Sequence, residues 1–378
     1  MSRLIGPGST IGILGAGQLG RMLALVARRM GYRIAVFGGD RSSPCGQVAD
    51  LVWPGDYENE DQLLEFATNC DVVTYEFENI PAHAAAIIEK QTLLSPSTEL
   101  LRTAQNRFIE KTALADLGLP TAKFRMVSSG SELARAITDF GGDVILKANT
   151  DGYDGKGQWA LSGPSDALAL WDSTSLSEAI VEQKVTFDFE LSVVAGRYES
   201  GECEFYKPLL NHHENHILDV SISGSELVTP TIANTAIEIA RAVLERFDVV
   251  GVLCVELFLT SNGQLVVNEI APRPHNSGHL TIEAYNCSQF ELQLRTICGL
   301  PKVPVIQAAP VAAMANLLGQ HLPPEWTVAS TKCLADVNLH LYGKCDGKTN
   351  RKMGHLTSIG ECPESVERYV RDGRTALQ

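Results

Sequence analysis

Apolar and polar residues come in blocks near the start of the chain, and these blocks predict two strands around one helix. Residues 11–14 (IGIL) and 33–37 (RIAVF) are short apolar runs of strand length. Between them, the apolar residues of segment 18–30 recur near helical spacing, and Gly31 follows the last of them. This order predicts a β-α-β unit with two parallel strands.

The same alternation of helix and strand patterns continues to about residue 105. Residues 61–70 (DQLLEFATNC) have the pattern of a helix, and residues 71–81 (DVVTYEFENIP) contain a buried strand. Glu76 and Glu78 come at the far end of that strand, two residues apart, so we expect them to point to the same side. Ligands of open α/β sheets bind at the carboxyl ends of strands, which favours a ligand role over a solvated strand end.

A later pair of apolar runs predicts a hairpin that carries two opposed carboxylates. Residues 251–271 read as two strands around Asn262-Gly263, a strong signal for a two-residue turn. With that turn residue 261 faces residue 264, and counting back along both strands places Glu256 opposite Glu269. Opposed carboxylates on buried strands repel each other, so we expect a divalent cation between them. Magnesium bridging nucleotide phosphates is the usual occupant, and an exposed pair of acids is the alternative.

Composition and charge narrow the class of protein. A chain of 378 residues is long for one core, so we expect two or three domains. The net charge of −14 argues against general binding to nucleic acids or anionic membranes. No apolar run has the length of a signal-peptide core or a membrane span. The nine cysteines include no C-x-x-C pair, which is typical of reduced thiols in a cytoplasmic protein.

The first glycine-rich turn has two interpretations. Gly15, Gly17 and Gly20 form G-x-G-x-x-G between the first strand and the helix, and Asp40 lies about where a ribose-binding acid would lie. This pattern indicates dinucleotide binding, but the same glycines also allow close packing of strand, turn and helix. In either case the helix N-terminus offers free N–H groups to an anion.

The second glycine-rich stretch, VILKANTDGYDGKGQWAL at 144–161, lies between two strand-like runs. A plain hairpin explains one Asp-Gly turn, but not three X-Gly pairs in succession. So much glycine loses conformational entropy on ordering, which indicates a lid that is loose when empty and closes over a ligand. Backbone N–H groups, Lys156 and the preceding Lys147 would contact phosphates. Together with the paired glutamates, this lid predicts an ATP site built on sheets.

These segments, in this order, resemble the 5-(carboxyamino)imidazole ribonucleotide synthetase family of the ATP-grasp superfamily over nearly the whole chain. The resemblance rests on GILGAGQLGRM, TYEFENI, NRFIEKTALADLGLPTA, LKANTDGYDGKGQ, VEQKVTFDFELS, VELF, VNEIAPRPHNSGH and LYGKCDGKTNRKMGH. It implies an α/β and α+β fold of three parts. These are a parallel pre-ATP-grasp domain at 1–105, an ATP-grasp domain at 106–300 with a glycine-lid subdomain at about 120–190, and a small β-rich domain at 301–378.

The resemblance also implies site residues. The ATP contacts would be Arg107, Lys147, Gly152, Tyr153, Asp154, Gly155, Lys156, Gly157, Gln158, Glu182, Gln183, Lys184, Val185, Glu190, His213, Asn268 and Glu269. Glu256 and Glu269 would hold magnesium. The ribonucleotide would contact Gln18, Leu19, Glu76, Asn276, Lys344, Arg351 and Lys352, whereas Lys348 has no such support. The competing interpretation of the segment around His213 is a zinc site at His212 and His216. That segment lacks helical periodicity, and no third ligand is obvious.

The implied reaction joins bicarbonate to the exocyclic amine of 5-aminoimidazole ribonucleotide, with ATP converted to ADP and phosphate through carboxyphosphate. We expect Asp154 to help take the proton from the attacking amine, and Lys156 and Lys344 to place the carboxylate, with Tyr153 the remaining reactive side chain of the lid. The resemblance also suggests a homodimer.

Three alternatives remain open at this point. A formate-dependent glycinamide ribonucleotide transformylase has the same fold, but Tyr153-Asp154 in the lid and Asn276 favour the carboxylating family. An NAD-dependent oxidoreductase would use G-x-G-x-x-G but leaves the paired glutamates and the lid unexplained. A nucleotide-binding scaffold would bind magnesium-ATP and never turn it over.

Overall fold

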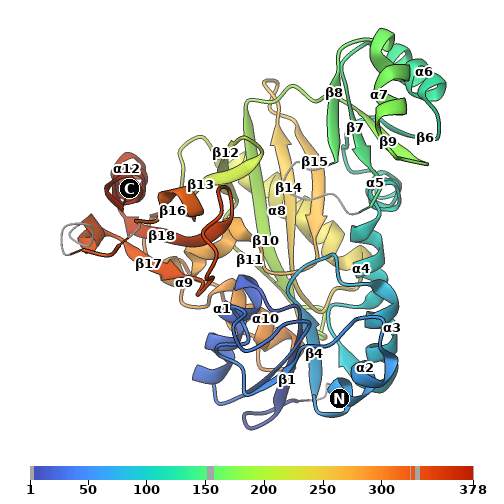
Figure 1. The fold of residues 1–378 in the computed structure, drawn as a ribbon. Coiled ribbons are helices and arrows are strands. Elements are labelled where there is room, and N and C mark those ends of the chain that lie inside the picture. Colours follow the sequence, from blue (N-terminus) through green and yellow to red (C-terminus); the bar gives the residue numbers. More distant parts are fainter. Residues whose placement is uncertain (1–3, 151–156, 324, 328–332, 378) are drawn as a thin grey trace.

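Three sheets organise the chain in this computed structural model, which describes residues 4–150, 157–323, 325–327 and 333–377 (Figure 1). The N-terminal sheet lies at one end of the molecule and a small four-stranded sheet at the other, with the largest sheet between them. Within the described residues, no helix is both long and apolar enough to cross a membrane.

The N-terminal domain is a parallel sheet in the order β3-β2-β1-β4-β5, as the β-α-β pattern predicts. Buried strands read as apolar runs because helices cover them, and every residue of β1 is buried. The elements are β1 (Thr10–Leu14), α1 (Gln18–Arg29), β2 (Arg33–Phe37), β3 (Leu51–Trp53), α2 (Glu60–Thr68), β4 (Val72–Tyr75), α3 (Ala82–Gln91) and β5 (Leu93–Leu94). Helices α4 (Thr98–Gln105) and α5 (Arg107–Asp116) lead out of this domain.

The four-stranded sheet carries the predicted glycine-rich hairpin. Its order is β6-β9-β7-β8, and β7 and β8 are antiparallel neighbours on either side of the loop. Residues 151–156 of the loop lie outside the described residues. The elements are β6 (Phe124–Val127), α6 (Gly130–Phe140), β7 (Val144–Ala148), β8 (Gln158–Leu161), α7 (Ala167–Ser173) and β9 (Ala179–Gln183).

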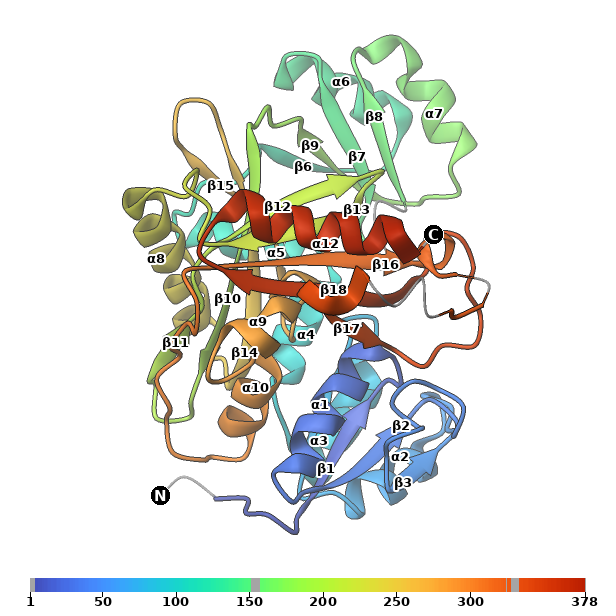
Figure 2. The ribbon, with the colours of Figure 1, turned by 90° about the vertical axis from the view of Figure 1, so that its left-hand side faces the viewer.

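The largest sheet is antiparallel and also takes in the C-terminal strands. Its order is β15-β14-β10-β12-β13-β16-β18-β17, with β11 beside β10. Because β16 pairs with β13, the segment after residue 300 continues this sheet, and α12 lies across it (Figure 2). The strands are β10 (Phe189–Arg197), β11 (Cys203–Phe205), β12 (Leu209–Glu214), β13 (Ile217–Ser223), β14 (Gly251–Leu259), β15 (Leu265–Ala271), β16 (Val311–Leu318), β17 (Asn338–Leu341) and β18 (Lys352–Gly360). The helices are α8 (Pro230–Arg246), η2 (Asn276–Leu280), α9 (Thr281–Ala284), α10 (Gln289–Ile297) and α12 (Pro363–Leu377).

The register of the β14–β15 hairpin confirms one prediction and corrects another. Glu256 does face Glu269. The predicted two-residue turn is wrong, because Leu259 pairs with Leu265 and the N–H of Thr260 bonds to the carbonyl of Gln264, which makes the loop longer. An irregularity after Glu256 then shifts the register by one residue. The longer loop moves the pairing by one residue and this shift moves it back, so Glu256 and Glu269 still face each other.

Candidate active site

One cavity of about 1010 Å³ brings together residues from all parts of the chain. Most of the predicted ATP and ribonucleotide residues line it: Gln18, Leu19, Arg107, Lys147, Gln158, Glu182, Gln183, Lys184, Val185, Glu190, His213, Glu256, Asn268, Glu269, Asn276, Lys344 and Lys352. Its size fits a nucleotide together with a second small substrate.

Two buried lysines share one carboxylate at the lid side of the cavity. Lys147 lies 2.9 Å and Lys111 3.3 Å from the Glu182 carboxylate. Burial raises the pKa of Glu182, but the two lysines outweigh it and lower the pKa to about 2. Burial lowers the pKa of Lys147. The sequence interpretation named Glu182 as an ATP contact, and it missed that the Glu182 side chain balances the charge of Lys147.

The cavity lining also includes an aromatic pair and a histidine–glutamate pair. Phe187 and Phe258 stack with ring centroids 4.3 Å apart, and both line the cavity. His213 Nδ1 lies 2.8 Å from Glu190. Glu190 lies on β10 and His213 on the neighbouring strand β12. His212 and His216 lie in the β12–β13 hairpin region instead of on a helix. Among the described residues, no group of three or more His, Cys, Asp or Glu is placed to hold a metal ion, so the zinc alternative has no support.

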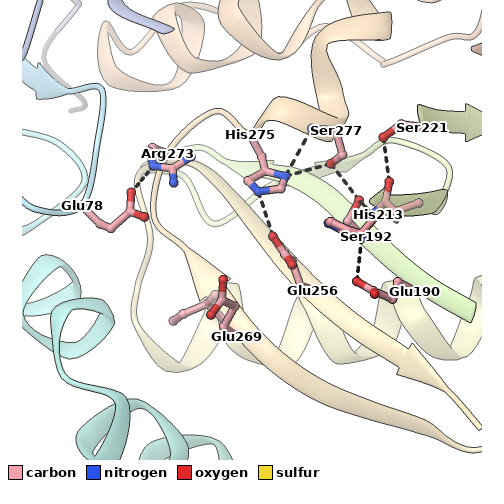
Figure 3. A network of polar contacts seen from close by, with 12 residues as sticks. Glu78, Glu190, Ser192, His213, Ser221, Glu256, Glu269, Arg273, His275 and Ser277 are labelled. Carbon is pink, nitrogen blue, oxygen red and sulfur yellow. Dashed lines mark hydrogen bonds and ion pairs between the residues drawn. The ribbon is translucent and has the colours of Figure 1, made fainter. Parts of the chain in front are cut away.

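Each of the two opposed glutamates lies beside a cationic side chain, and Figure 3 shows the contact between Glu256 and His275. Glu269 lies 2.9 Å from Arg107, and Glu256 lies 2.8 Å from Nε2 of His275. Burial raises the pKa of Glu256, but His275 outweighs it and lowers the pKa to about 2. Burial lowers the pKa of His275, whereas Cys254 and Glu256 raise it, to about 10 overall. Two carboxylates on one strand pair, with Asn268 also in the lining, offer hard oxygen donors that fit magnesium.

Arg273, His275 and Glu110 are site residues that the sequence reasoning did not single out. Arg273 forms an ion pair with Glu78, whose pKa is raised by burial but lowered by Arg273 to about 2. Glu110 accepts a hydrogen bond from the N–H of Ile270, and burial raises its pKa to about 8. Arg273 and His275 lie in PRPHNSGH, directly after β15, so charged residues at the end of a buried strand were the available signal.

Glu76 and Glu78 do not point to the same side, which corrects the prediction. The strand β4 ends at Tyr75, so the two-residue alternation no longer applies beyond it. Glu78 reaches Arg273, whereas Glu76 turns to the first glycine-rich turn. There it accepts hydrogen bonds from the N–H groups of Gly17 and Gly20 at the start of α1.

This contact answers the question raised by G-x-G-x-x-G. The chain's own carboxylate occupies the N-terminus of α1, where a dinucleotide would place its pyrophosphate. A Cβ atom at Gly17 would lie 2.6 Å from Oε1 of Glu76, so the glycine is needed to admit Glu76. The turn therefore does not support an NAD-dependent oxidoreductase.

The C-terminal basic residues are divided between the cavity and the surface. Lys344 and Lys352 line the cavity, and Lys344 Nζ donates to the carbonyl of Lys352 at 2.6 Å. Arg351 lies outside the lining and forms an ion pair with Asp346. Glu76 and Gly157 also lie outside the lining. Gly152, Tyr153, Asp154, Gly155 and Lys156 lie outside the described residues.

Comparison with protein families divides the chain into three matches. Residues 9–105 match the ribonucleotide synthetase preATP-grasp domain, and residues 112–290 match the ATP-grasp domain. Residues 312–369 match the phosphoribosylaminoimidazole carboxylase C-terminal domain.

Curated relatives and solved structures are similar over nearly the whole chain. An N5-carboxyaminoimidazole ribonucleotide synthase of Bacillus subtilis is 38% identical, covering 94% of this chain and 92% of that protein. A bifunctional purine synthesis protein purC/E of Dictyostelium discoideum is 41% identical over 93% of this chain, which spans 37% of that longer protein.

Two crystal structures extend the comparison to the fold. An ADP complex of an N5-carboxyaminoimidazole ribonucleotide synthetase has a TM-score of 0.92 at 39% identity, covering 99% of this chain and 98% of that one. An Aspergillus clavatus N5-carboxyaminoimidazole synthase, solved with ADP and 5-aminoimidazole ribonucleotide, has a TM-score of 0.88 at 28% identity, covering 98% and 99%.

Proposed function

The chain belongs to the N5-carboxyaminoimidazole ribonucleotide synthase family of ATP-grasp enzymes, and from this premise we propose its reaction and the residues that perform it. The enzyme carboxylates the exocyclic amine of 5-aminoimidazole ribonucleotide, using ATP and bicarbonate and releasing ADP and phosphate, as a ligase of purine biosynthesis. The observation that carries the assignment is one cavity lined both by the ATP-grasp sheets and by Gln18 of the N-terminal domain and Lys344 of the C-terminal segment.

Different residues along the cavity would contact different parts of the nucleotide and its magnesium ion. Lys147, balanced by Glu182, would contact nucleotide phosphates, and the Phe187–Phe258 pair offers an aromatic face to the base. Glu190 and His213 would hold the ribose and phosphate groups. Glu256 and Glu269 would hold magnesium, which when bound would neutralise charge on the phosphates.

The carboxylation half of the reaction needs a site closed to water. Bicarbonate attacks the terminal phosphoryl group of ATP and gives carboxyphosphate and ADP. The amine nitrogen then bonds to the carboxyl carbon of carboxyphosphate, from which phosphate leaves, or to CO₂, which forms when carboxyphosphate has first lost phosphate. Carboxyphosphate hydrolyses easily, so we assign the lid the role of excluding water. We propose that Asp154 takes the amine proton, that Lys156 and Lys344 place the carboxylate, and that Tyr153 contacts the reacting groups.

The ribonucleotide phosphate would be held by the basic residues Lys344 and Lys352, with Gln18, Leu19 and Asn276 around the rest of the molecule. Arg351 remains a proposed contact, which requires its separation from Asp346. Glu76 would act here through the turn that bears Gln18 and Leu19, because it bonds to the N–H groups on either side of them.

The decisive measurement is ADP formation from magnesium-ATP and 5-aminoimidazole ribonucleotide, with and without added bicarbonate, with ¹³C from labelled bicarbonate followed by NMR. Bicarbonate-dependent turnover with label in a new carbamate is the expected result. ATP binding without such turnover would contradict the proposal, and glycinamide ribonucleotide with formate would then be tested.

We also propose that the enzyme is a cytoplasmic homodimer. The family resemblance supports the dimer, and eight of the nine cysteines, which are free thiols, fit a reducing compartment. Sedimentation equilibrium that gave the mass of a single chain at working concentrations would contradict the dimer, and fractionation of the source cells would test the location.

A further inference from the structure

A continuous chain of buried polar side chains leads from β13 to the ring of His275 (Figure 3). Ser221 Oγ donates to Asn211 Oδ1 at 2.7 Å, and Asn211 Nδ2 donates to Ser192 Oγ at 2.9 Å. The Ser192 and Ser277 hydroxyls lie 2.8 Å apart, and the Ser277 hydroxyl lies 2.9 Å from Nδ1 of His275. The family matches and the roles assigned above leave these four polar residues without a function.

The chain crosses three strands of the largest sheet, β13, β12 and β10, and then reaches η2, which follows β15. Ser221 and Asn211 are register partners on β13 and β12, and Ser192 on β10 is the register partner of Glu256 on β14. Ser192, Ser221 and Ser277 are fully buried, and Asn211 is 5% exposed. Polar groups buried among apolar strands are costly unless each is bonded. This arrangement bonds each of the four residues to its neighbour.

The chain can hold the His275 ring whichever way its hydrogen bonds run from donor to acceptor. Each serine hydroxyl carries one hydrogen, so the bonds all run one way along the chain. With the Asn211 amide nitrogen toward Ser192 they run to Nδ1 of a neutral His275 ring, and with the amide reversed they run from its Nδ1–H, as a cationic ring requires. In both cases Ser277 holds Nδ1, which leaves Nε2 directed at Glu256, 2.8 Å away.

The backbone of His275 is fixed separately. The buried Gln289 side chain on α10 accepts from the His275 N–H at 2.8 Å and donates to the His275 carbonyl at 2.7 Å. Ring and backbone are therefore held by different elements, and the Ser277 hydroxyl acts on the ring together with the Ser277 N–H, which lies 3.4 Å from Nδ1. A histidine fixed so completely, with one edge open to the cavity, is typical of a preorganised site.

We propose that Ser277, Ser192 and Asn211 are positioning residues, which hold the His275 ring against Glu256 for phosphoryl transfer. This rests on the proposed function, because it assigns Glu256 to the nucleotide side of the reaction. The chain ends at the His275 ring beside Glu256, so it acts on the proposed nucleotide side and not on the binding of the ribonucleotide phosphate.

The test compares Ser277→Ala and Ser192→Ala with Ser277→Thr, which keeps the hydroxyl. The matched control is Ser223→Ala, a buried serine on β13 whose hydroxyl contacts Tyr285 and Gln307 instead of the chain. We expect kcat for ADP formation to fall about 10–100-fold in Ser277→Ala, the range for lost support of a functional histidine. The KM for 5-aminoimidazole ribonucleotide should change less than about threefold, and Ser277→Thr should restore kcat.

A second readout uses the free enzyme and needs no turnover. The ring signals of His275, identified by their loss in His275→Gln, are followed by NMR of histidine-labelled protein. Both alanine variants should shift them and Ser223→Ala should not. Folded Ser277→Ala and Ser192→Ala with unshifted signals and control-level kcat would overturn the proposal. If Ser277→Ala does not fold, Ser192→Ala decides. Shifted signals in an enzyme that makes no carbamate would support the positioning role and contradict the proposed function.

Discussion

The Glu76 carboxylate accepts a hydrogen bond from the N–H of Gly20 at 2.7 Å, at the N-terminus of α1. This contact places an acid that follows strand β4 in the anion site at the start of helix α1, which follows strand β1. Gln18, which follows Gly17, lines the cavity, so the contact also fixes the turn on the proposed ribonucleotide side of the cavity.

Glu76→Ala should lower the free energy of unfolding by about 1–3 kcal/mol, because it leaves the N–H groups of Gly17 and Gly20 without an acceptor. Urea denaturation measures the loss, and Glu65→Ala on the exposed face of α2 is the control. Wild-type protein should not enhance NADH fluorescence. Enhancement by the wild-type protein would show that Glu76 does not exclude a dinucleotide.

Glu269→Gln and Glu256→Gln should each reduce ADP formation by about 10²-fold or more, the scale of losing one electrostatic contact to the transferring group. The magnesium concentration for half-maximal rate should rise, since one charged oxygen donor is lost in each variant. Chelation of divalent ions should abolish wild-type activity, and added magnesium should restore it. Glu238→Gln on the exposed face of α8 is the control. An unchanged magnesium dependence would remove these residues from the metal site.

Lys344→Ala should raise the KM for 5-aminoimidazole ribonucleotide about 10–100-fold, as expected for one charge-assisted contact to a phosphate. Lys348→Ala is a close control, because Lys348 is exposed and pairs with Asp346 outside the cavity lining. Steady-state kinetics at saturating ATP measure the KM for 5-aminoimidazole ribonucleotide in both variants. Equal effects of both substitutions would indicate a general charge effect instead of a specific contact.

Asp154→Asn should reduce coupled carboxylation by about 10²–10⁴-fold, the usual range for loss of a general base. ATP binding should persist, because we expect the phosphate contacts of the lid to come from backbone N–H groups and lysines. Carbamate formation by ¹³C NMR, with nucleotide binding measured in parallel, tests this role. Full coupled activity in the variant would show the assignment to be wrong.

Glu182→Gln should lower the free energy of unfolding by about 3–5 kcal/mol, because it leaves Lys111 and Lys147 buried without their counter-charge. The pKa of Glu182 is lowered from 4.5 to about 2, so its stabilising effect is present above pH 4.5 and is lost as pH falls toward 2. Melting temperature against pH should therefore fall less steeply in acid for the variant. Asp139→Asn breaks the exposed pair with Arg125 and should cost at most about 1 kcal/mol. Parallel acid profiles would contradict this account.

The sequence by itself determined the local elements and the chemistry of the loops. The spacing of apolar residues over 10–37 predicted β1, α1 and β2, because the periods of helix and strand differ. The glycine-rich stretch after Lys147 and the paired acids predicted a nucleotide site, and the order of the motifs predicted the family. These are properties of neighbouring residues, and they do not depend on distant contacts.

The tertiary structure alone decided where several side chains go. Glu76 turns to α1 because β4 stops one residue before it, and Glu256 faces Glu269 because the irregularity beside it offsets a loop longer than the sequence indicates. The C-terminal strands join the largest sheet through β16, and the serines of the chain to His275 meet from separate strands. Each of these placements depends on the register of the strands and on the residues at which they end. These are set by packing across the whole sheet, so no local pattern reveals them.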